Sequence, residues 1–255
     1  MAGSSEQVWL TYALSDASVK DALTLSFSLR NVLTSRKIGV IISYKVSVSL
    51  REALEYGFDY VFYLDEERNT AGLKSEEFVK LFALTLKSFE RCVMLSPKML
   101  VMSNCDELFD NGNDEEEKEN ENSQPLIWSE TGDMSILLLN PSLHLFKEVM
   151  KGIRYEGNGE LQAYLKKWLR NQNPKSKFLD RKYNRSLCAS SGMLLQSEND
   201  ISIVNLNNIP NNVDKLKGYV EKRIMEVSMN IRNEKVEPLL KALLNDSTSL
   251  EMLEG

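Results

Sequence analysis

The sequence predicts an α/β domain in which a mainly parallel sheet is covered by helices. Short apolar runs alternate with longer segments whose apolar residues recur at helical spacing. Several of these runs are continuous and rich in β-branched residues, as is typical of strands buried on both faces. Regular alternation of strand and helix favours a parallel sheet with helices on its faces. A chain of 255 residues is long enough for one such domain with an appended segment.

The first part of the chain supplies four predicted strands with helices between them. Asp16 is the expected N-cap of the first helix, whose apolar residues continue to Val32. The sequence Ser96-Pro97-Lys98 then interrupts two apolar strands, of which the second covers 99–102. The four strands are expected at 8–13, 38–42, 60–64 and 91–95, and the two further helices at 47–56 and about 76–89.

The middle of the chain is interrupted by an acidic segment at about 110–124. Residues 110–122 include no apolar side chain and are mostly Asp, Glu and Asn. This composition predicts a solvated, mobile loop, with a docking segment for a basic partner as the alternative.

Ordered structure is expected to resume at 126–128. A strand at 135–140 leads to Pro141, which suits the first turn of a helix through Met150. A helix at about 160–169 and a strand at 201–204 follow.

The last part of the chain forms a predicted helical segment. Its apolar residues recur at helical spacing from Val213 to Ile231, and Pro238 opens a final short helix. We therefore expect one domain over 1–208 and a helical segment over 209–255 that packs on it or extends from it. A stripe that binds a partner or a second copy is the alternative interpretation.

Composition argues against several classes of protein. The net charge is −6 and the pI about 5.1, without the basic face of a nucleic-acid-binding protein or a polybasic patch for anionic membranes. No apolar window is long enough to span a bilayer, and residues 1–7 lack the apolar core of a signal peptide. The three cysteines are scattered, and Cys92 lies within an apolar run. These features predict a cytoplasmic protein that binds neither nucleic acid nor membrane.

The order of several short stretches resembles the glycogenin family of retaining nucleotide-sugar glycosyltransferases from Gln7 to about Asn208. The resemblance implies that 1–208 is a single Rossmann-like domain of the GT-A type. It also implies that a nucleotide binds at the carboxyl ends of the parallel strands. The matching stretches are Asp16-Ala17 with Lys20 and Ala22-Leu23, Lys80-Leu81, Cys92-Val93, Asp106-Glu107-Leu108-Phe109-Asp110, Pro141-Ser142, and Leu179-Asp180 with Tyr183-Asn184.

The resemblance also implies a metal site, at which the sequence departs from the family pattern. Family enzymes hold manganese with two carboxylates of an Asp-x-Asp motif and a late histidine, ligands that suit this ion. The matching positions here are Ser96, Lys98 and Asn205. The single histidine, His144, lies elsewhere with no candidate ligands near it in sequence. We therefore expect no metal cofactor, because the family manganese site is lost.

Other positions that the family uses for the donor also differ. Ser18 stands where a tyrosine stacks on uracil. Asp133 and Met134 fall in the stretch that contacts the donor sugar in the family. Leu161 and Gln162 fall in the motif whose aspartate lies near the reacting carbon, with Leu161 in place of that aspartate. Asp133, Leu161 and Gln162 are thus degenerate catalytic positions, and we assign no catalytic residue.

Some positions could still bind a nucleotide sugar. Lys80 matches a family residue that faces the donor, with a solvent-facing helix lysine as the alternative interpretation. If binding is retained, the expected contacts come from Thr11, Lys80, Ser96, Lys98 and Asn205.

These losses favour a catalytically inactive, glycogenin-like protein that acts as a scaffold or regulatory partner in glycogen initiation. Its expected partners are a second copy, an active glycogenin or glycogen synthase. The alternative is a metal-independent or weak UDP-glucose glucosyltransferase in which Lys98 replaces the metal, since an ammonium group can bind phosphate. A third possibility is a sensor that binds a nucleotide or oligosaccharide without reacting.

Overall fold

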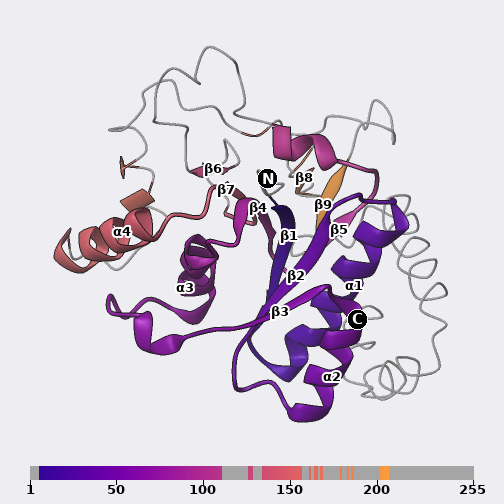
Figure 1. The fold of residues 1–255 in the computed structure, drawn as a ribbon, viewed down its shortest axis with the longest axis horizontal. Coiled ribbons are helices and arrows are strands. Elements are labelled where there is room, and N and C mark those ends of the chain that lie inside the picture. The colour runs from indigo at the N-terminus through magenta and orange to yellow at the C-terminus, as the bar shows by residue number, and fades with distance from the viewer. Residues whose placement is uncertain are drawn as a thin grey trace, which may run out of the picture.

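A six-stranded sheet forms the centre of the molecule (Figure 1). The computed structural model describes residues 6–110, 126–128, 134–156 and 202–206, and positions 161, 164, 165, 167, 168, 179, 183, 185 and 186. The strand order is β3-β2-β1-β4-β7-β6. The strands are β1 (Glu6–Ala13), β2 (Lys37–Ile42), β3 (Tyr60–Tyr63), β4 (Phe89–Leu95), β6 (Leu126–Trp128) and β7 (Ile136–Leu139).

The sheet is mainly parallel, as the sequence predicts. β1 pairs in parallel with both β2 and β4, and β2 pairs in parallel with β3. β7 runs antiparallel to β4, and β6 runs antiparallel to β7. The carboxyl ends of β1 and β4 therefore meet at the same edge of the sheet.

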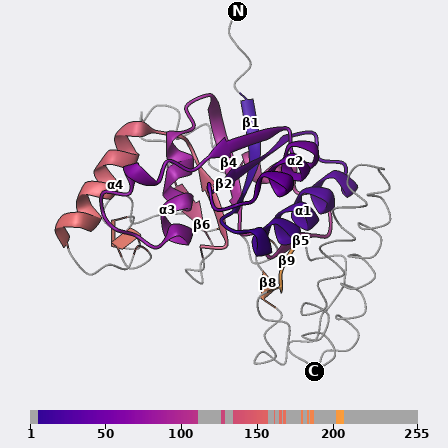
Figure 2. The same cartoon turned by 90° about the horizontal axis from the view of Figure 1, so that it is seen from below.

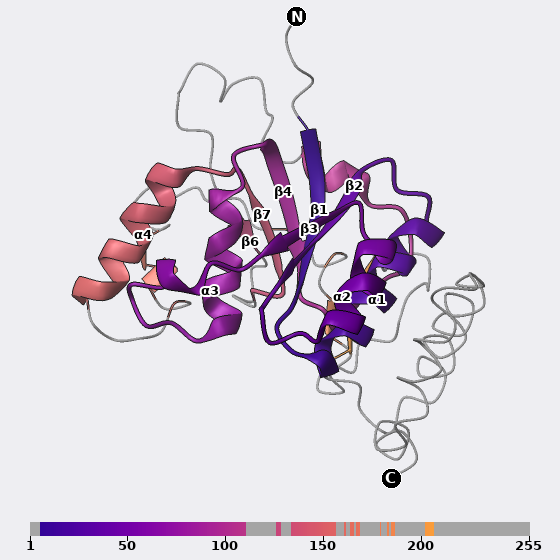
Figure 3. The same cartoon turned by 60° about the horizontal axis from the view of Figure 1, so that its bottom comes forward.

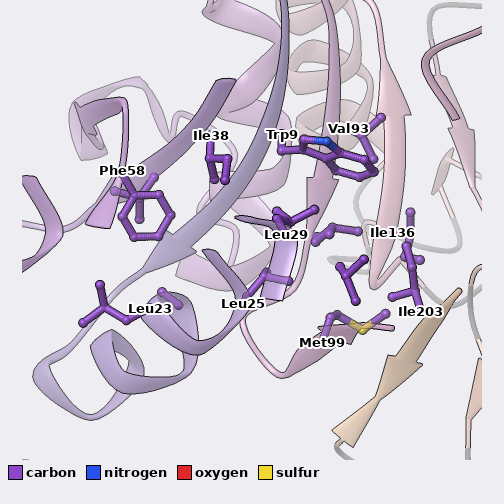
Figure 4. Close-up of a cluster of buried hydrophobic side chains, with 14 of the residues drawn as sticks. Trp9, Leu23, Leu25, Leu29, Ile38, Phe58, Val93, Met99, Ile136 and Ile203 are labelled. Carbon is purple, nitrogen blue, oxygen red and sulfur yellow. The ribbon is translucent and has the colours of Figure 1, made fainter. Parts of the chain in front are cut away.

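Helices cover both faces of this sheet (Figures 2 and 3). α1 (Asp16–Asn31) and α2 (Val48–Gly57) lie on one face. α3 (Ser75–Phe82) and α4 (Leu143–Glu156) lie on the other face. Alternate β1 side chains point to opposite faces, so Leu10 joins the buried cluster under α3 and α4. Its neighbour Trp9 joins the cluster under α1 and α2 (Figure 4).

A second, smaller sheet adjoins the first. It contains β5 (Met99–Val101), β9 (Ile203–Asn205) and β8 (Arg185–Ser186), in the order β5-β9-β8. β5 pairs with β9 in antiparallel register, which places Met99 opposite Asn205. The break after β4 is therefore the point at which the chain leaves one sheet and enters another.

Asp106 connects the short helix η3 (Asp106–Asp110) to the core. Its carboxylate accepts hydrogen bonds from the Trp9 indole N–H at 3.2 Å, from the Thr34 hydroxyl, and from the backbone N–H and hydroxyl of Ser35. Burial alone would raise the pKa of Asp106, but these hydrogen bonds outweigh burial and lower it. The ring of Phe109 packs edge-on against Trp9, with centroids 4.9 Å apart. Asp106 and Phe109, two residues of the stretch 106–110 that resembles the family, thus have a structural role.

The starts of two predicted helices require correction. α1 begins at Asp16 with Ser15 as its N-cap, and the Ser15 N–H donates to the Ser18 hydroxyl. Asp16 instead accepts the N–H of Ser47 at 2.7 Å. α4 begins at Leu143, after Pro141, because the Ser142 hydroxyl accepts a hydrogen bond from the helix backbone. The prediction that Pro141 lies in the first turn is wrong.

Four predicted boundaries also shift. The helix expected at 76–89 ends at Phe82 and continues as the 3₁₀ turn Ala83–Thr85. Phe89 already belongs to β4, where it is buried and pairs with Glu6. α4 extends past Met150 to Glu156, and β9 begins at Ile203 rather than at 201.

Two predicted segments fall outside the described residues. These are the helical segment 209–255 and residues 111–124 of the acidic segment. Within the described part of the chain, no helix is long and apolar enough to cross a membrane.

The Asp106 network predicts a pH-dependent contribution to stability. Asp106→Asn should lower the free energy of unfolding at pH 7 by about 1–3 kcal/mol, because a charged hydrogen-bond acceptor is lost. The folded-state pKa of Asp106 lies below its ordinary value of 3.8. The stabilisation is therefore full above that value and is lost as the pH falls through the folded-state pKa. Urea unfolding followed by tryptophan fluorescence at pH 7 and below pH 4 would measure both effects.

The matched control is Glu55→Gln, which removes one exposed carboxylate on α2. An Asp106→Asn variant as stable as this control at pH 7 would contradict the prediction.

Candidate functional site

A hollow of about 360 Å³ opens at the carboxyl ends of β1 and β4. Open α/β sheets characteristically bind ligands at this edge. The hollow is lined by Tyr12, Leu14, Ser15, Ser18, Asp21, Glu76, Lys80, Ser96, Pro97, Lys98 and Ser135. Residues from the first helix, the third helix and the β4–β5 break therefore face one space.

Backbone hydrogen bonds hold the β4–β5 break on both sides. The Ser96 N–H donates to the carbonyl oxygen of Ser135 at 2.8 Å. The carbonyl oxygen of Lys98 accepts the N–H of Leu206 at 2.9 Å. Ser96 is buried, whereas Lys98 is exposed at the hollow. The bonds at this break involve backbone atoms and do not depend on the side chains at 96 and 98.

Asn205 reaches the same region from β9. Its side-chain Nδ2 donates to the Ser135 hydroxyl at 3.1 Å, and Asn205 itself is buried. Ser135 thus contacts Asn205 through its side chain and Ser96 through its carbonyl group. Of the three positions that match the family's metal ligands, Ser96 and Asn205 thus meet at Ser135, and Lys98 lines the same hollow as Ser96 and Ser135.

The side chains at these three positions do not fit a manganese ion. Manganese favours carboxylate oxygens with imidazole, whereas Ser96, Lys98 and Asn205 offer a neutral hydroxyl, an ammonium group and an amide. The ammonium group repels a cation, and the amide nitrogen already donates to Ser135. No group of three or more His, Cys, Asp or Glu side chains gathers among the residues that the structure describes.

Ser18 lines the hollow but its hydroxyl group serves the helix. The hydroxyl oxygen accepts the N–H groups of Leu14 at 3.0 Å and Ser15 at 3.1 Å. The hydroxyl also donates to the Ser15 carbonyl oxygen at 2.7 Å. Ser18 therefore caps α1 and provides no ring on which a base could stack.

Lys80 and Glu76 bring opposite charges into the hollow from α3. They lie one turn apart on the same helix face, and both line the hollow. Glu76 is exposed and Lys80 is half-buried. Lys80 thus lies where a donor-binding residue is expected, and its binding role stays a prediction.

Asp21 is a charged residue of the hollow that the sequence reasoning missed. It lies on α1 three residues after Ser18, which places both on one helix face. Burial raises the pKa of the Asp21 carboxyl, and the charges of Lys98 and Lys20 only partly oppose that rise. The spacing from Ser18 was the available signal, because Ser18 was already assigned to the donor site.

The remaining predicted positions lie away from the hollow or outside the described residues. Thr11 is buried within β1 and does not line the hollow, while its neighbour Tyr12 does. Leu161 is fully buried in the apolar cluster beneath α3 and α4. Asp133 and Gln162 lie outside the described residues.

Sequence comparison finds relatives of one kind. The chain is 32% identical over 178 residues to glycogenin-2 of Homo sapiens, covering 66% of this chain and 34% of that protein. It is 26% identical over 180 residues to glycogenin-1 of Oryctolagus cuniculus, covering 64% of this chain and 52% of that protein. The chain thus spans about half the length, or less, of these relatives. No protein-family model matches it.

Solved structures with the same fold are glycosyltransferases. The glycosyltransferase GlyE of Streptococcus pneumoniae has a TM-score of 0.61 at 15% identity, over 88% of this chain and 62% of that one. The bifunctional glycosyltransferase WbbM has a TM-score of 0.59 at 12% identity, over 90% of this chain and 52% of that one. At these identities the likeness shows the fold alone. The chain is thus similar in sequence to glycogenins over about two thirds of its length, and it has the GT-A glycosyltransferase fold.

Proposed function

We propose that this chain is a glycogenin-like protein that acts by binding, as a scaffold or regulatory partner in glycogen initiation, and that it does not transfer sugar. The observation that supports this proposal is the chemistry at the break after β4. Ser96 and Asn205 both bond to Ser135, and Lys98 lines the same hollow as Ser96. These three positions match the metal ligands of the family, but they offer no carboxylate and no imidazole, and Lys98 adds a positive charge.

Loss of the metal site has a large expected effect on rate. A metal ion stabilises the charge that develops on a leaving diphosphate by several kcal/mol. Each 1.36 kcal/mol lost from transition-state stabilisation slows a reaction about tenfold. The hollow also lacks an aromatic ring at Ser18. These combined losses support a binding role over turnover.

The partners that we propose are a second copy of the chain, an active glycogenin or glycogen synthase. A heterodimer with an active glycogenin follows most directly from the shared fold, because homologous domains can present similar surfaces. In such a complex the active subunit would supply the chemistry, and this chain would contribute a surface.

The proposal predicts no sugar transfer by the purified full chain. With manganese and UDP-glucose, the protein should gain no hexose mass and should release UDP no faster than Lys80→Ala. Intact-mass spectrometry and a UDP-release assay measure the two quantities, with glycogenin-1 of Homo sapiens assayed in parallel. Hexose addition that Lys80→Ala abolishes would overturn the proposal.

A second candidate function is supported by the position of two lysines. Lys98 and Lys80 line the same hollow, where a donor diphosphate would lie. An ammonium group binds phosphate as a point charge, so Lys98 could replace part of the metal's role. This candidate is a metal-independent or weak UDP-glucose glucosyltransferase.

EDTA separates the two candidates. A transferase that relies on Lys98 should release UDP from UDP-glucose in EDTA, and Lys98→Ala should abolish that release. We expect no release from either protein. Release in EDTA that depends on Lys98 would favour the second candidate.

The partner proposal predicts a mixed complex with an active glycogenin. When the two full chains are combined at micromolar concentration, sedimentation velocity should show a species heavier than either chain alone. Fluorescent labels on each chain would establish that both are in that species. Unchanged sedimentation of both chains would contradict this partner assignment.

A further inference from the structure

Opposite charges are balanced among the described residues that line the hollow. Two carboxylates, Asp21 and Glu76, and two ammonium groups, Lys80 and Lys98, line it. The other polar lining side chains are hydroxyls, which carry no charge. A site for a nucleoside diphosphate would need a surplus of positive charge, since the ligand carries several negative charges. Among the residues that the structure describes, the lining of this hollow has no such surplus.

Asp21 and Glu76 differ in how strongly they can act on a bound anion. Asp21 is half-buried on α1, whereas Glu76 is exposed on α3. Solvent and salt screen an exposed charge much more than a partly buried one. Asp21 should therefore dominate the repulsion of an anion in the hollow.

Asp21 and Lys98 line the same hollow without forming a salt bridge, so Asp21 acts on Lys98 through its charge at a distance. The positive charge of Lys98 favours the ionised form of Asp21, although burial has the larger, opposite effect on the Asp21 pKa. A diphosphate entering the hollow would compete with Asp21 for Lys98. It would also lie close to a like charge, an arrangement that weakens binding strongly.

We propose that Asp21 is an internal counter-anion that excludes nucleoside diphosphates from this hollow by neutralising Lys98. Asp21 is then the residue that determines ligand specificity here, and its removal should restore anion binding. The proposal rests on the proposed function only in treating the hollow as the counterpart of a donor site.

The test is the affinity of the full-length chain for UDP in EDTA at low salt, measured by calorimetry. Asp21→Asn should bind UDP at least about tenfold more tightly than the wild type, because a like charge is removed while the size of the side chain is kept. Glu76→Gln should give a smaller gain. The surface control Glu55→Gln, which also removes one negative charge, should give none.

Three further measurements test whether any gain in UDP affinity comes from Asp21 and Lys98 and whether the variant stays folded. In the double variant Asp21→Asn with Lys98→Ala, the gain in UDP affinity should disappear. Inorganic pyrophosphate should show the same gain as UDP, whereas uridine, which carries no phosphate, should show none. The melting temperature of Asp21→Asn should equal or exceed that of the wild type, since burial disfavours the ionised carboxyl.

Several outcomes would overturn the inference. These are equal UDP affinities of the wild type and Asp21→Asn, a gain that survives loss of Lys98, or an equal gain from Glu55→Gln. The proposed function is judged separately by sugar transfer. Turnover by the wild type would overturn the proposed function, whereas an unchanged affinity of Asp21→Asn would overturn only this inference.

Discussion

The break between β4 and β5 is the constraint on which the candidate site depends. At this point the chain leaves the six-stranded sheet for the three-stranded one, and backbone hydrogen bonds from Ser96 and to Lys98 hold it. Because these bonds use backbone atoms, they form with almost any side chains at 96 and 98. The fold can therefore stay the same while the side chains at the break change. Backbone atoms specify the fold at this point, and side-chain atoms specify the chemistry of the site.

The residues compared with the glycogenin family fall into two groups, those that hold the fold together and those at the candidate site. Asp106 and Phe109 hold η3 against Trp9, and Cys92 is buried in β4. Changing them would cost packing or leave buried groups without partners. Lys98 is exposed and is under no such constraint, and the buried Ser96 bonds to the neighbouring strand through its backbone N–H. A glycogenin-like sequence with a different donor site is thus physically consistent, and similarity alone does not establish activity.

Sequence reasoning predicted the sheet better than the site. Continuous apolar runs identified β1, β2 and β4, because strands buried on both faces leave a strong local signal. The end of α3 depends on strand pairing by the residues that follow it, and the start of α4 depends on a capping hydrogen bond. Neither contact leaves a comparable pattern in the sequence. Asp21 was missed because its importance depends on which helix face meets the hollow, and that follows from tertiary packing. Thr11 and Tyr12 show the same limit, since the choice between them depends on strand orientation.

Lys98 brings a positive charge to a position where the family resemblance leads one to expect a carboxylate. Another residue of the same hollow supplies the opposite charge. Lys98 is exposed at the hollow, so it does not require a partner, but its charge is favoured by a carboxylate on the same hollow. Asp21 provides that carboxylate from α1, within the same chain. The charges of the described lining residues then balance without a ligand, and a diphosphate that approaches Lys98 must also approach Asp21. A single carboxylate can thus both neutralise Lys98 and exclude the ligand for which the fold is suited.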